Sequence, residues 1–260
     1  VQVFMKSDGM LGGVDEAIAI LKRCGDFAAY EVKALFDGDP VSPHEPVLTI
    51  EGPYAAFAHL ETLYLGVLSR RTRIATQTAE VVAAAQPKDV LYFPARHDHW
   101  AVQQGDGYAA HIAGAAGVST DAQGMLWGGA GLGTLPHALI AAYGGDTVLA
   151  ARKFAEHIET TVPLVVLVDF DNDCVGTSLA VAEALGARLH SVRLDTSGTL
   201  VDRSDVDIMG QFDPRGVNPE LVKNVRKALD AVGRNDVRIV VSGGFDAGKV
   251  RRFEALDLPV

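Results

Sequence analysis

After residue 86, short apolar runs alternate with helical patterns, and this alternation restricts the fold more than any other feature of the sequence. It predicts a parallel sheet, because a strand that returns in the same direction needs a crossover connection, usually a helix. A β/α barrel fits this pattern, whereas a doubly wound sheet would need a switch in strand order that the pattern does not reveal. The predicted strands span residues 90–95, 117–120, 164–169, 190–195 and 239–242. The predicted helices span residues 103–113, 136–143, 145–160, 177–185, 218–231 and 247–256.

The first 85 residues have a different character. Apolar residues at helical spacing predict a helix over residues 13–23. Residues 30–35 and 47–50 are typical of short strands, and residues 53–85 carry a long helical pattern that we interpret as two helices. We therefore expect an α+β domain with linking helices over residues 1–85, followed by an α/β domain over residues 86–260.

The composition limits the partners that the protein can bind. The 260 residues carry a net charge of −10, which disfavours nucleic acid and membrane surfaces as partners. No apolar run is long enough to span a bilayer, and no signal peptide opens the chain. The chain has two cysteines, which fits a reduced cytoplasmic location. Because it begins at Val1 and stops within a strand-like segment, we expect residues to be missing from both ends.

Polar side chains follow three of the predicted strands. Asp169 ends one strand, Arg193 and Asp195 lie on one face of the next, and Ser242 begins a Ser-Gly-Gly turn before a helix. Each feature alone has a structural explanation, since acidic residues after strands often cap the next helix. The carboxyl ends of parallel strands gather such residues in one pocket, however. Together they predict an active site in which backbone N–H groups of the glycine turn hold a phosphate.

Other motifs have competing interpretations. Gly243 to Lys249 has the GxxxxGK spacing of a nucleotide-binding loop, but the next residue is valine and lacks the hydroxyl that magnesium needs, so we reject that interpretation. His97 and His99 are candidates for metal ligation, but no third ligand is near in sequence, and a hydrogen-bonded turn is favoured. The three arginines within residues 70–73 form either a solvated helix face or a site that attracts phosphate, and both alternatives stay open.

The segment Gly-Thr-Leu-Pro-His-Ala-Leu-Ile at residues 133–140 resembles the Gly-Thr-x-Pro-His segment of nicotinate phosphoribosyltransferases. Over roughly residues 10–260 the chain is similar to the nicotinate/nicotinamide phosphoribosyltransferase group and, more distantly, to the quinolinate enzymes. The resemblance implies an incomplete (α/β) barrel with an N-terminal α+β domain, and a homodimer with a shared active site. It also implies nicotinate and phosphoribosyl pyrophosphate as substrates, ATP as co-substrate and Mg²⁺ as cofactor. Further similar segments occur in the family's order at residues 64–68, 93–97, 116–120, 193–198 and 241–244.

The resemblance also implies roles for individual residues. His137 matches the histidine that ATP phosphorylates in the family. Asp169 and Asp195 match carboxylates at the ribose and its magnesium, and Arg193 matches a substrate contact. The family often has Arg-Arg where this chain has Arg96-His97, which changes the charge expected in the base pocket. The other substrate-binding candidates are the ring-stacking Phe93, Arg96 of the base pocket, Ser119, and the 5′-phosphate cradle of Ser242, Gly243 and Gly244.

We therefore expect an ATP-coupled nicotinate phosphoribosyltransferase that makes nicotinate mononucleotide and pyrophosphate in NAD biosynthesis. Within the same chemistry, a quinolinate or nicotinamide enzyme is the alternative. The quinolinate version is disfavoured because no lysine is among the candidate site residues. From another class, the alternative is a phosphate-binding barrel that is a lyase or isomerase, or a non-catalytic ligand-binding homologue, which would share the Ser-Gly-Gly turn.

Overall fold

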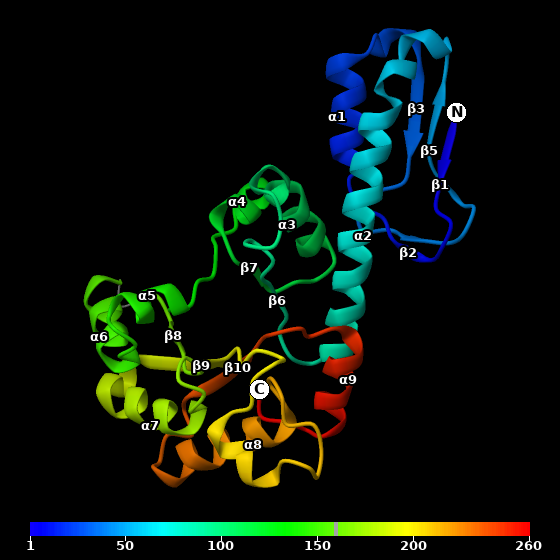
Figure 1. Ribbon diagram of the computed structural model, residues 1–260. Coiled ribbons are helices and arrows are strands. Elements are labelled where there is room, and N and C mark those ends of the chain that lie inside the picture. The colour runs from blue at the N-terminus through cyan, green and yellow to red at the C-terminus, as the bar shows by residue number, and fades with distance from the viewer. Residues whose placement is uncertain (159–160) are drawn as a thin grey trace. The chain divides into compact units, whose positions relative to one another are not determined.

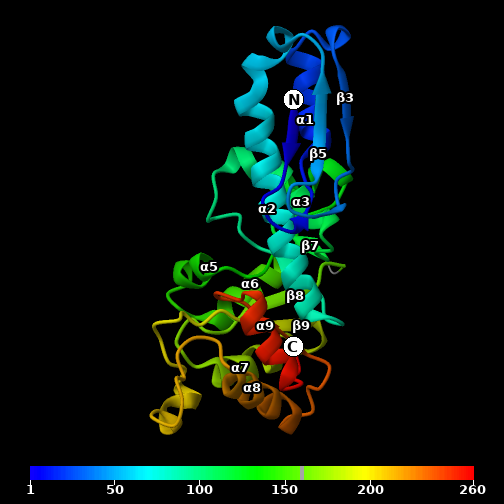
Figure 2. The ribbon, with the colours of Figure 1, turned by 90° about the vertical axis from the view of Figure 1, so that its right-hand side faces the viewer.

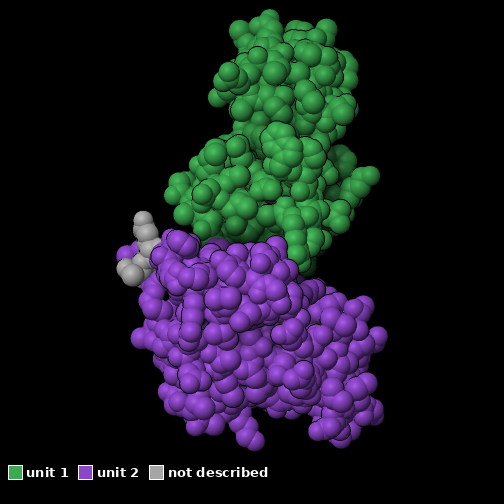
Figure 3. All heavy atoms as spheres, turned by 60° about the vertical axis from the view of Figure 1, so that its left-hand side comes forward, with its two compact units in different colours: residues 1–132 green, residues 133–260 purple. Residues whose placement is uncertain are grey.

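The computed structural model of the chain describes residues 1–158 and 161–260. The chain divides into two compact units, residues 1–132 and residues 133–260, which Figure 3 distinguishes by colour. The α/β class is confirmed, with a small N-terminal α+β domain and a barrel-like C-terminal α/β domain. In the part of the chain that the structure describes, no helix combines the length and the apolarity needed to cross a membrane.

The first unit begins with a three-stranded antiparallel sheet in the order β1-β5-β3 (Figure 1). Helices α1 (Val14–Cys24) and α2 (Glu61–Ala85) share one apolar core with this sheet, in which Leu21, Ile50 and Tyr64 are almost completely buried. The sheet strands are β1 (Gln2–Phe4), β3 (Glu31–Ala34) and β5 (Pro46–Glu51), and a second antiparallel pair joins β2 (Gly9–Met10) to β4 (Pro40–Val41).

The expectation of two helices within residues 53–85 is wrong. Short 3₁₀ turns are followed by one α2 helix of 25 residues. Its buried positions recur every three or four residues from Tyr64 to Thr78, so one continuous face packs against the rest of the unit. The helix ends before Pro87, because the residue preceding a proline is disfavoured in the helical conformation.

The rest of the first unit places two short parallel strands beside further helices. Strands β6 (Leu91–Tyr92) and β7 (Gly117–Val118) pair with each other, and both are shorter than predicted. Phe93 and Ser119 therefore lie in the loops that directly follow the two strand ends. The helices of this part are α3 (Gln103–Ile112) and α4 (Asp121–Gly124).

The second unit is built on a parallel sheet in the order β10-β9-β8 (Figures 1 and 2). Helices α6, α7 and α8 pack in succession against one another and share the core with the sheet. The strands are β8 (Leu164–Leu167), β9 (Leu189–Leu194) and β10 (Arg238–Val241). The helices are α5 (His137–Ala142), α6 (Thr147–His157), α7 (Cys174–Leu185), α8 (Pro219–Ala231) and α9 (Ala247–Ala255).

All three strands of this sheet and the helices near them were predicted, and their bounds differ mainly at the ends. The last residues of the helix predicted over 145–160 lie outside the described residues. Each strand stops one or two residues before the polar residue that was expected to end it. Asp169, Asp195 and Ser242 therefore lie in loops beyond the sheet edge, where a side chain is free of the constraints of strand pairing.

Candidate active site

The carboxyl edge of the β10-β9-β8 sheet brings together candidates from three separate parts of the second unit. Asp169 follows β8, Asp195 follows β9 and Ser242 follows β10. Because β9 is the central strand, its residues can contact those of both neighbours. The parallel register aligns Arg193 of β9 with Val240 of β10 and with Leu167 of β8, so the loops leave all three strands at the same level.

Arg193 is the centre of a hydrogen-bonded network at this edge. Its Nη2 lies 3.0 Å from Asp195 Oδ2, and its Nε donates to Ser242 Oγ at 2.9 Å. The Ser242 hydroxyl donates to the other Asp195 oxygen at 2.6 Å. The remaining guanidinium branch donates to Thr134 Oγ1 at 2.9 Å, a residue that was not among those predicted for the site. Arg193 and Asp195 are largely buried, so the network holds both charges in fixed orientations.

His137 and Asp169 form a second pair in the same unit. His137 is the first residue of α5, which begins one residue after the start predicted from the sequence, because Pro136 is the N-cap. Its Nε2 lies 3.2 Å from Asp169 Oδ2. The Asp169 side chain is 6% exposed and that of His137 is 40% exposed, so a buried carboxylate holds an imidazole that a ligand can reach. The other Asp169 oxygen, Oδ1, is buried and has no hydrogen-bond partner among the described residues.

Burial raises the pKa of Asp169, and His137 opposes this shift by favouring the ionised form. Because the pKa of Asp169 is raised in the folded state, this residue stabilises the fold fully at pH values below the pKa of an unfolded carboxyl, which is about 3.9. The stabilisation is lost as the pH rises through the pKa of the folded state. Asp169→Asn cannot ionise. We therefore expect its free energy of unfolding, relative to the unchanged protein, to increase from about pH 4 to about pH 7 in urea titrations.

The control for this prediction is Asp207→Asn, which changes an exposed carboxyl of the same unit. The difference in the free energy of unfolding between this variant and the unchanged protein should vary little over the same pH range. If the free energy of unfolding of Asp169→Asn differed from that of the unchanged protein by the same amount at each pH, the proposed cost of ionising this buried group would be contradicted.

The Ser-Gly-Gly turn leads from β10 toward α9. Gly243 and Gly244 have φ angles of 91° and 68°, in the left-handed region that favours glycine. Asp246 caps α9 by accepting from the backbone N–H of Lys249 at 2.7 Å. A glycine turn directly before a helix exposes backbone N–H groups at the positive end of the helix dipole, which suits a phosphate.

Phe93, Arg96 and Ser119 belong to the first unit. Phe93 follows β6 and is half-buried, and Arg96 is exposed. Ser119 follows β7, and its backbone N–H and its hydroxyl both donate to Gln123 Oε1, at 3.0 Å and 2.8 Å. The structure brings the seven candidates of the second unit together at one sheet edge, and it places these three after the strands of the first unit.

The basic cluster at residues 70–73 forms ion pairs within the first unit. Arg70 and Arg71 both bind the carboxylate of Asp106 on α3, and Arg71 also pairs with Glu16 on α1 at 2.8 Å. Asp106 is 2% exposed, so this cluster is part of the packing of three helices. Arg71 is buried, so a solvated helix face is wrong for this residue, and the phosphate-attracting interpretation of the cluster stays a prediction.

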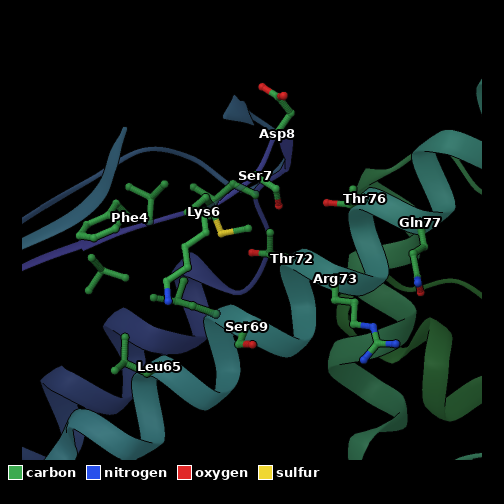
Figure 4. Close-up of a pocket in the computed structure, with 15 residues that line it drawn as sticks. Phe4, Lys6, Ser7, Asp8, Leu65, Ser69, Thr72, Arg73, Thr76 and Gln77 are labelled. Carbon is green, nitrogen blue, oxygen red and sulfur yellow. The ribbon is translucent and has the colours of Figure 1, made fainter. Parts of the chain in front are cut away.

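Arg73 is exposed and lines a hollow of about 540 Å³ in the first unit (Figure 4). Lys6 and Thr76 also line it, and Figure 4 shows Thr76 and Arg73 projecting from α2. None of the candidate substrate-binding residues lines this hollow. It is therefore separate from the candidate substrate-binding residues, although Arg73 of the basic cluster lines it.

Comparison with protein families covers nearly the whole chain. Residues 1–72 match the N-terminal domain of quinolinate phosphoribosyl transferase, and residues 74–260 match the C-terminal domain of the same family. The two family domains meet near the middle of α2, which is one continuous helix in the structure.

The curated relatives bear the name nicotinate phosphoribosyltransferase. The pncB1 protein of Mycobacterium tuberculosis is 34% identical over 221 residues, which cover 83% of this chain and 45% of the relative. The protein of Bacillus subtilis is 26% identical over 225 residues, which cover 84% of this chain and 41% of the relative. The chain thus spans less than half the length of these two relatives.

Two solved structures are similar to this chain over almost its whole length. The nicotinate-nucleotide pyrophosphorylase from Pyrococcus furiosus is 37% identical, with a TM-score of 0.82 over 96% of this chain and 61% of that one. NadC from Streptococcus pyogenes is 19% identical, with a TM-score of 0.69 over 100% of this chain and 78% of that one, a likeness of fold alone. The resemblance noted from the sequence is confirmed at the level of the wider family, to which the nicotinate enzymes are related. The chain belongs to the quinolinate phosphoribosyltransferase family.

Proposed function

We propose that the protein transfers the phosphoribosyl group of phosphoribosyl pyrophosphate to the ring nitrogen of a pyridine carboxylate, releasing pyrophosphate, in NAD biosynthesis. The observation that carries this proposal is the convergence of Asp169, the Arg193–Asp195 pair and the Ser242 turn at one sheet edge. Quinolinate is the first candidate for the base, because both domains match the quinolinate family and the structural neighbours include nicotinate-nucleotide pyrophosphorylases. This reverses the order of bases expected from the sequence.

The residues at this edge suit the charges that the reaction develops. The nitrogen lone pair forms the bond to the anomeric carbon while the bond to pyrophosphate breaks, so positive charge grows on the sugar. Asp169 and Asp195 would stabilise that charge because they are already oriented and shielded from water. The Ser242-Gly243-Gly244 turn would hold the 5′-phosphate on backbone N–H groups. Arg193 has the planar fork that binds carboxylate or phosphate, and it fixes Asp195 in place.

The chemistry of these residues also fits a magnesium ion that arrives with the substrate. Asp169 Oδ1 is an acceptor without a hydrogen-bond partner among the described residues, and magnesium prefers carboxylate and phosphate oxygens. Across residues 1–158 and 161–260, no three side chains of the His, Cys, Asp and Glu types gather as a metal site of their own. Asp169 and Asp195 would hold the ion together with the pyrophosphate, whose leaving charge magnesium neutralises when bound.

Nicotinate with ATP coupling is the second candidate. It is favoured by the names of the curated relatives and by His137, whose exposed imidazole is held by the buried Asp169 carboxylate. A homodimer with a shared active site and a cytoplasmic location stay predictions from the sequence.

The test incubates the protein with phosphoribosyl pyrophosphate, magnesium and either quinolinate or nicotinate, with and without ATP. We expect nicotinate mononucleotide and pyrophosphate in equal amounts, and an equal amount of CO₂ when the base is quinolinate. Product from quinolinate alone supports the first candidate, whereas product from nicotinate that rises with ATP supports the second. Absence of mononucleotide with both bases would refute the proposed function.

A single substitution separates ATP coupling from transfer. If ATP phosphorylates His137, His137→Ala should remove the stimulation by ATP and leave the slower transfer that does not need ATP. The measurement is the ratio of initial rates with and without ATP, which should fall to about 1 in the variant. His157→Ala, which changes an exposed histidine of the same unit, is the control and should keep the ratio of the unchanged protein.

A further inference from the structure

Lys249 reaches back from α9 to the Ser-Gly-Gly turn. Its ammonium donates to the backbone carbonyl of Gly243, with 3.2 Å between Nζ and the oxygen. The same ammonium lies 4.1 Å from the ring centroid of Phe245 and 6.0 Å from that of Phe253, two rings that pack edge to face. The lysine is half-buried, so these contacts restrict both its stem and its charge.

Among the residues that the structure describes, no ion pair joins a carboxylate to this ammonium, which donates to the Gly243 carbonyl. Burial lowers the pKa of Lys249, the nearby Arg252 adds to this effect, and Asp246 opposes it. The charge of Asp246 is directed toward the helix, since its Oδ1 accepts from the backbone N–H of Lys249. The positive field of the ammonium therefore acts on the glycine turn.

The hydrogen bond to Gly243 controls the direction of the next N–H group. In a trans peptide the C=O of one residue and the N–H of the next point in opposite directions. Holding the Gly243 oxygen toward Lys249 thus directs the Gly244 N–H to the other side of the turn. The N–H groups of Gly243, Gly244 and Phe245 donate to no acceptor among the described residues, so they are available to a ligand.

We propose that Lys249 is a positioning residue for phosphate binding, which orients the N–H groups of the Gly243-Gly244 turn and adds positive charge behind it. This inference rests on the proposed function, in which the turn holds the 5′-phosphate. The inference also explains the GxxxxGK spacing of residues 243–249 without a nucleotide-binding loop. Lys249 lies behind the turn and acts through the backbone, whereas the lysine of a nucleotide-binding loop contacts phosphate directly.

The test compares Lys249→Met, Lys249→Arg and Arg251→Met by calorimetric titration with ribose 5-phosphate. Lys249→Met keeps an unbranched stem against Phe245 and loses both the donor and the charge, so its affinity should fall roughly tenfold. Lys249→Arg should restore most of the affinity. Arg251→Met removes an exposed positive charge from the same helix and should bind as the unchanged protein does.

Kinetics supply a readout that a loss of folding would not give. The KM for phosphoribosyl pyrophosphate should rise in Lys249→Met, while kcat for a saturating substrate should change little. Equal affinity of the unchanged protein and Lys249→Met for ribose 5-phosphate, including no binding by either, would overturn the inference. Weaker binding by Lys249→Met in a protein that makes no mononucleotide would support the role of Lys249 and refute the proposed activity.

Discussion

Replacing Arg193 with methionine is expected to lower kcat/KM for phosphoribosyl transfer by about 10²- to 10³-fold. The guanidinium of Arg193 contacts Asp195, Ser242 and Thr134, which come from three different segments of the second unit. Methionine would leave the largely buried Asp195 carboxylate without its cation, and Ser242 Oγ would lose the bond that it accepts from Arg193 while still donating to Asp195. Both the carboxylate at the sugar and the start of the phosphate cradle would then be held less firmly.

The matched control for this prediction is Arg215→Met. Arg215 also pairs with an aspartate two residues away, at 2.7 Å, but both side chains are exposed, and surface pairs of this kind contribute little. Arg193→Lys would keep the charge. The single ammonium of lysine could not contact all three partners as the planar guanidinium does, so the activity of this variant should lie between those of Arg193→Met and the unchanged protein. A kcat/KM for Arg193→Met within a few fold of the control would mean that this network is not part of the active site.

Replacing Asp106 with alanine is expected to lower the free energy of unfolding by about 3–5 kcal/mol, the range seen when one partner of a buried ion pair is removed. Asp106 accepts from both Arg70 and Arg71, and Arg71 is almost completely buried. Without this buried carboxylate, Arg70 would keep only Asp98 and Arg71 only Glu16 as carboxylate partners, and both of these carboxylates are far more exposed than Asp106. Urea denaturation of the purified protein, followed by circular dichroism, measures the change.

The surroundings of Arg71 explain why the fold cannot easily adjust to this loss. A Cβ at Gly105 would collide with the Arg71 guanidinium, so the side chain occupies space that only glycine leaves open. Glu31→Ala is the control, since it removes one partner of an exposed pair with Lys33 in the same unit. If Asp106→Ala were no less stable than this control, the three-helix network would not hold the first unit together.

The order and type of most elements could be predicted from the sequence, because periodicity is a local property of the chain. The strands of the second unit have apolar runs that end in polar residues, and those residues do lie together at the sheet edge. Strands β2 and β4, each of two residues, could not be found in this way. Such short pairings are set by contacts with residues far along the chain and not by their own pattern.

In the candidate site, too, local patterns could be predicted from the sequence and long-range contacts could not. The residue types of Asp169, Arg193, Asp195 and Ser242 indicated a charged pocket, and their roles in catalysis stay predictions. Their partners could not be predicted, because a hydrogen bond between Arg193 and Thr134 joins residues that no local pattern connects. The Asp106 carboxylate was missed for a similar reason. An acidic residue in a helical pattern is usually solvated, and only the packing of α2 against α3 shows that it is buried.

The strand order β10-β9-β8 also has a consequence for the time at which the binding site forms. Each pairing of parallel strands has to wait for a long crossover to close, which is slow because chain entropy is lost before contacts compensate for it. Asp169, Asp195 and Ser242 come together only when both crossovers, through α7 and through α8, are complete. A chain that has assembled only part of this sheet has secondary structure but no site. Ligands of the site would therefore bind the finished fold alone, and by mass action they would draw newly made chains toward it.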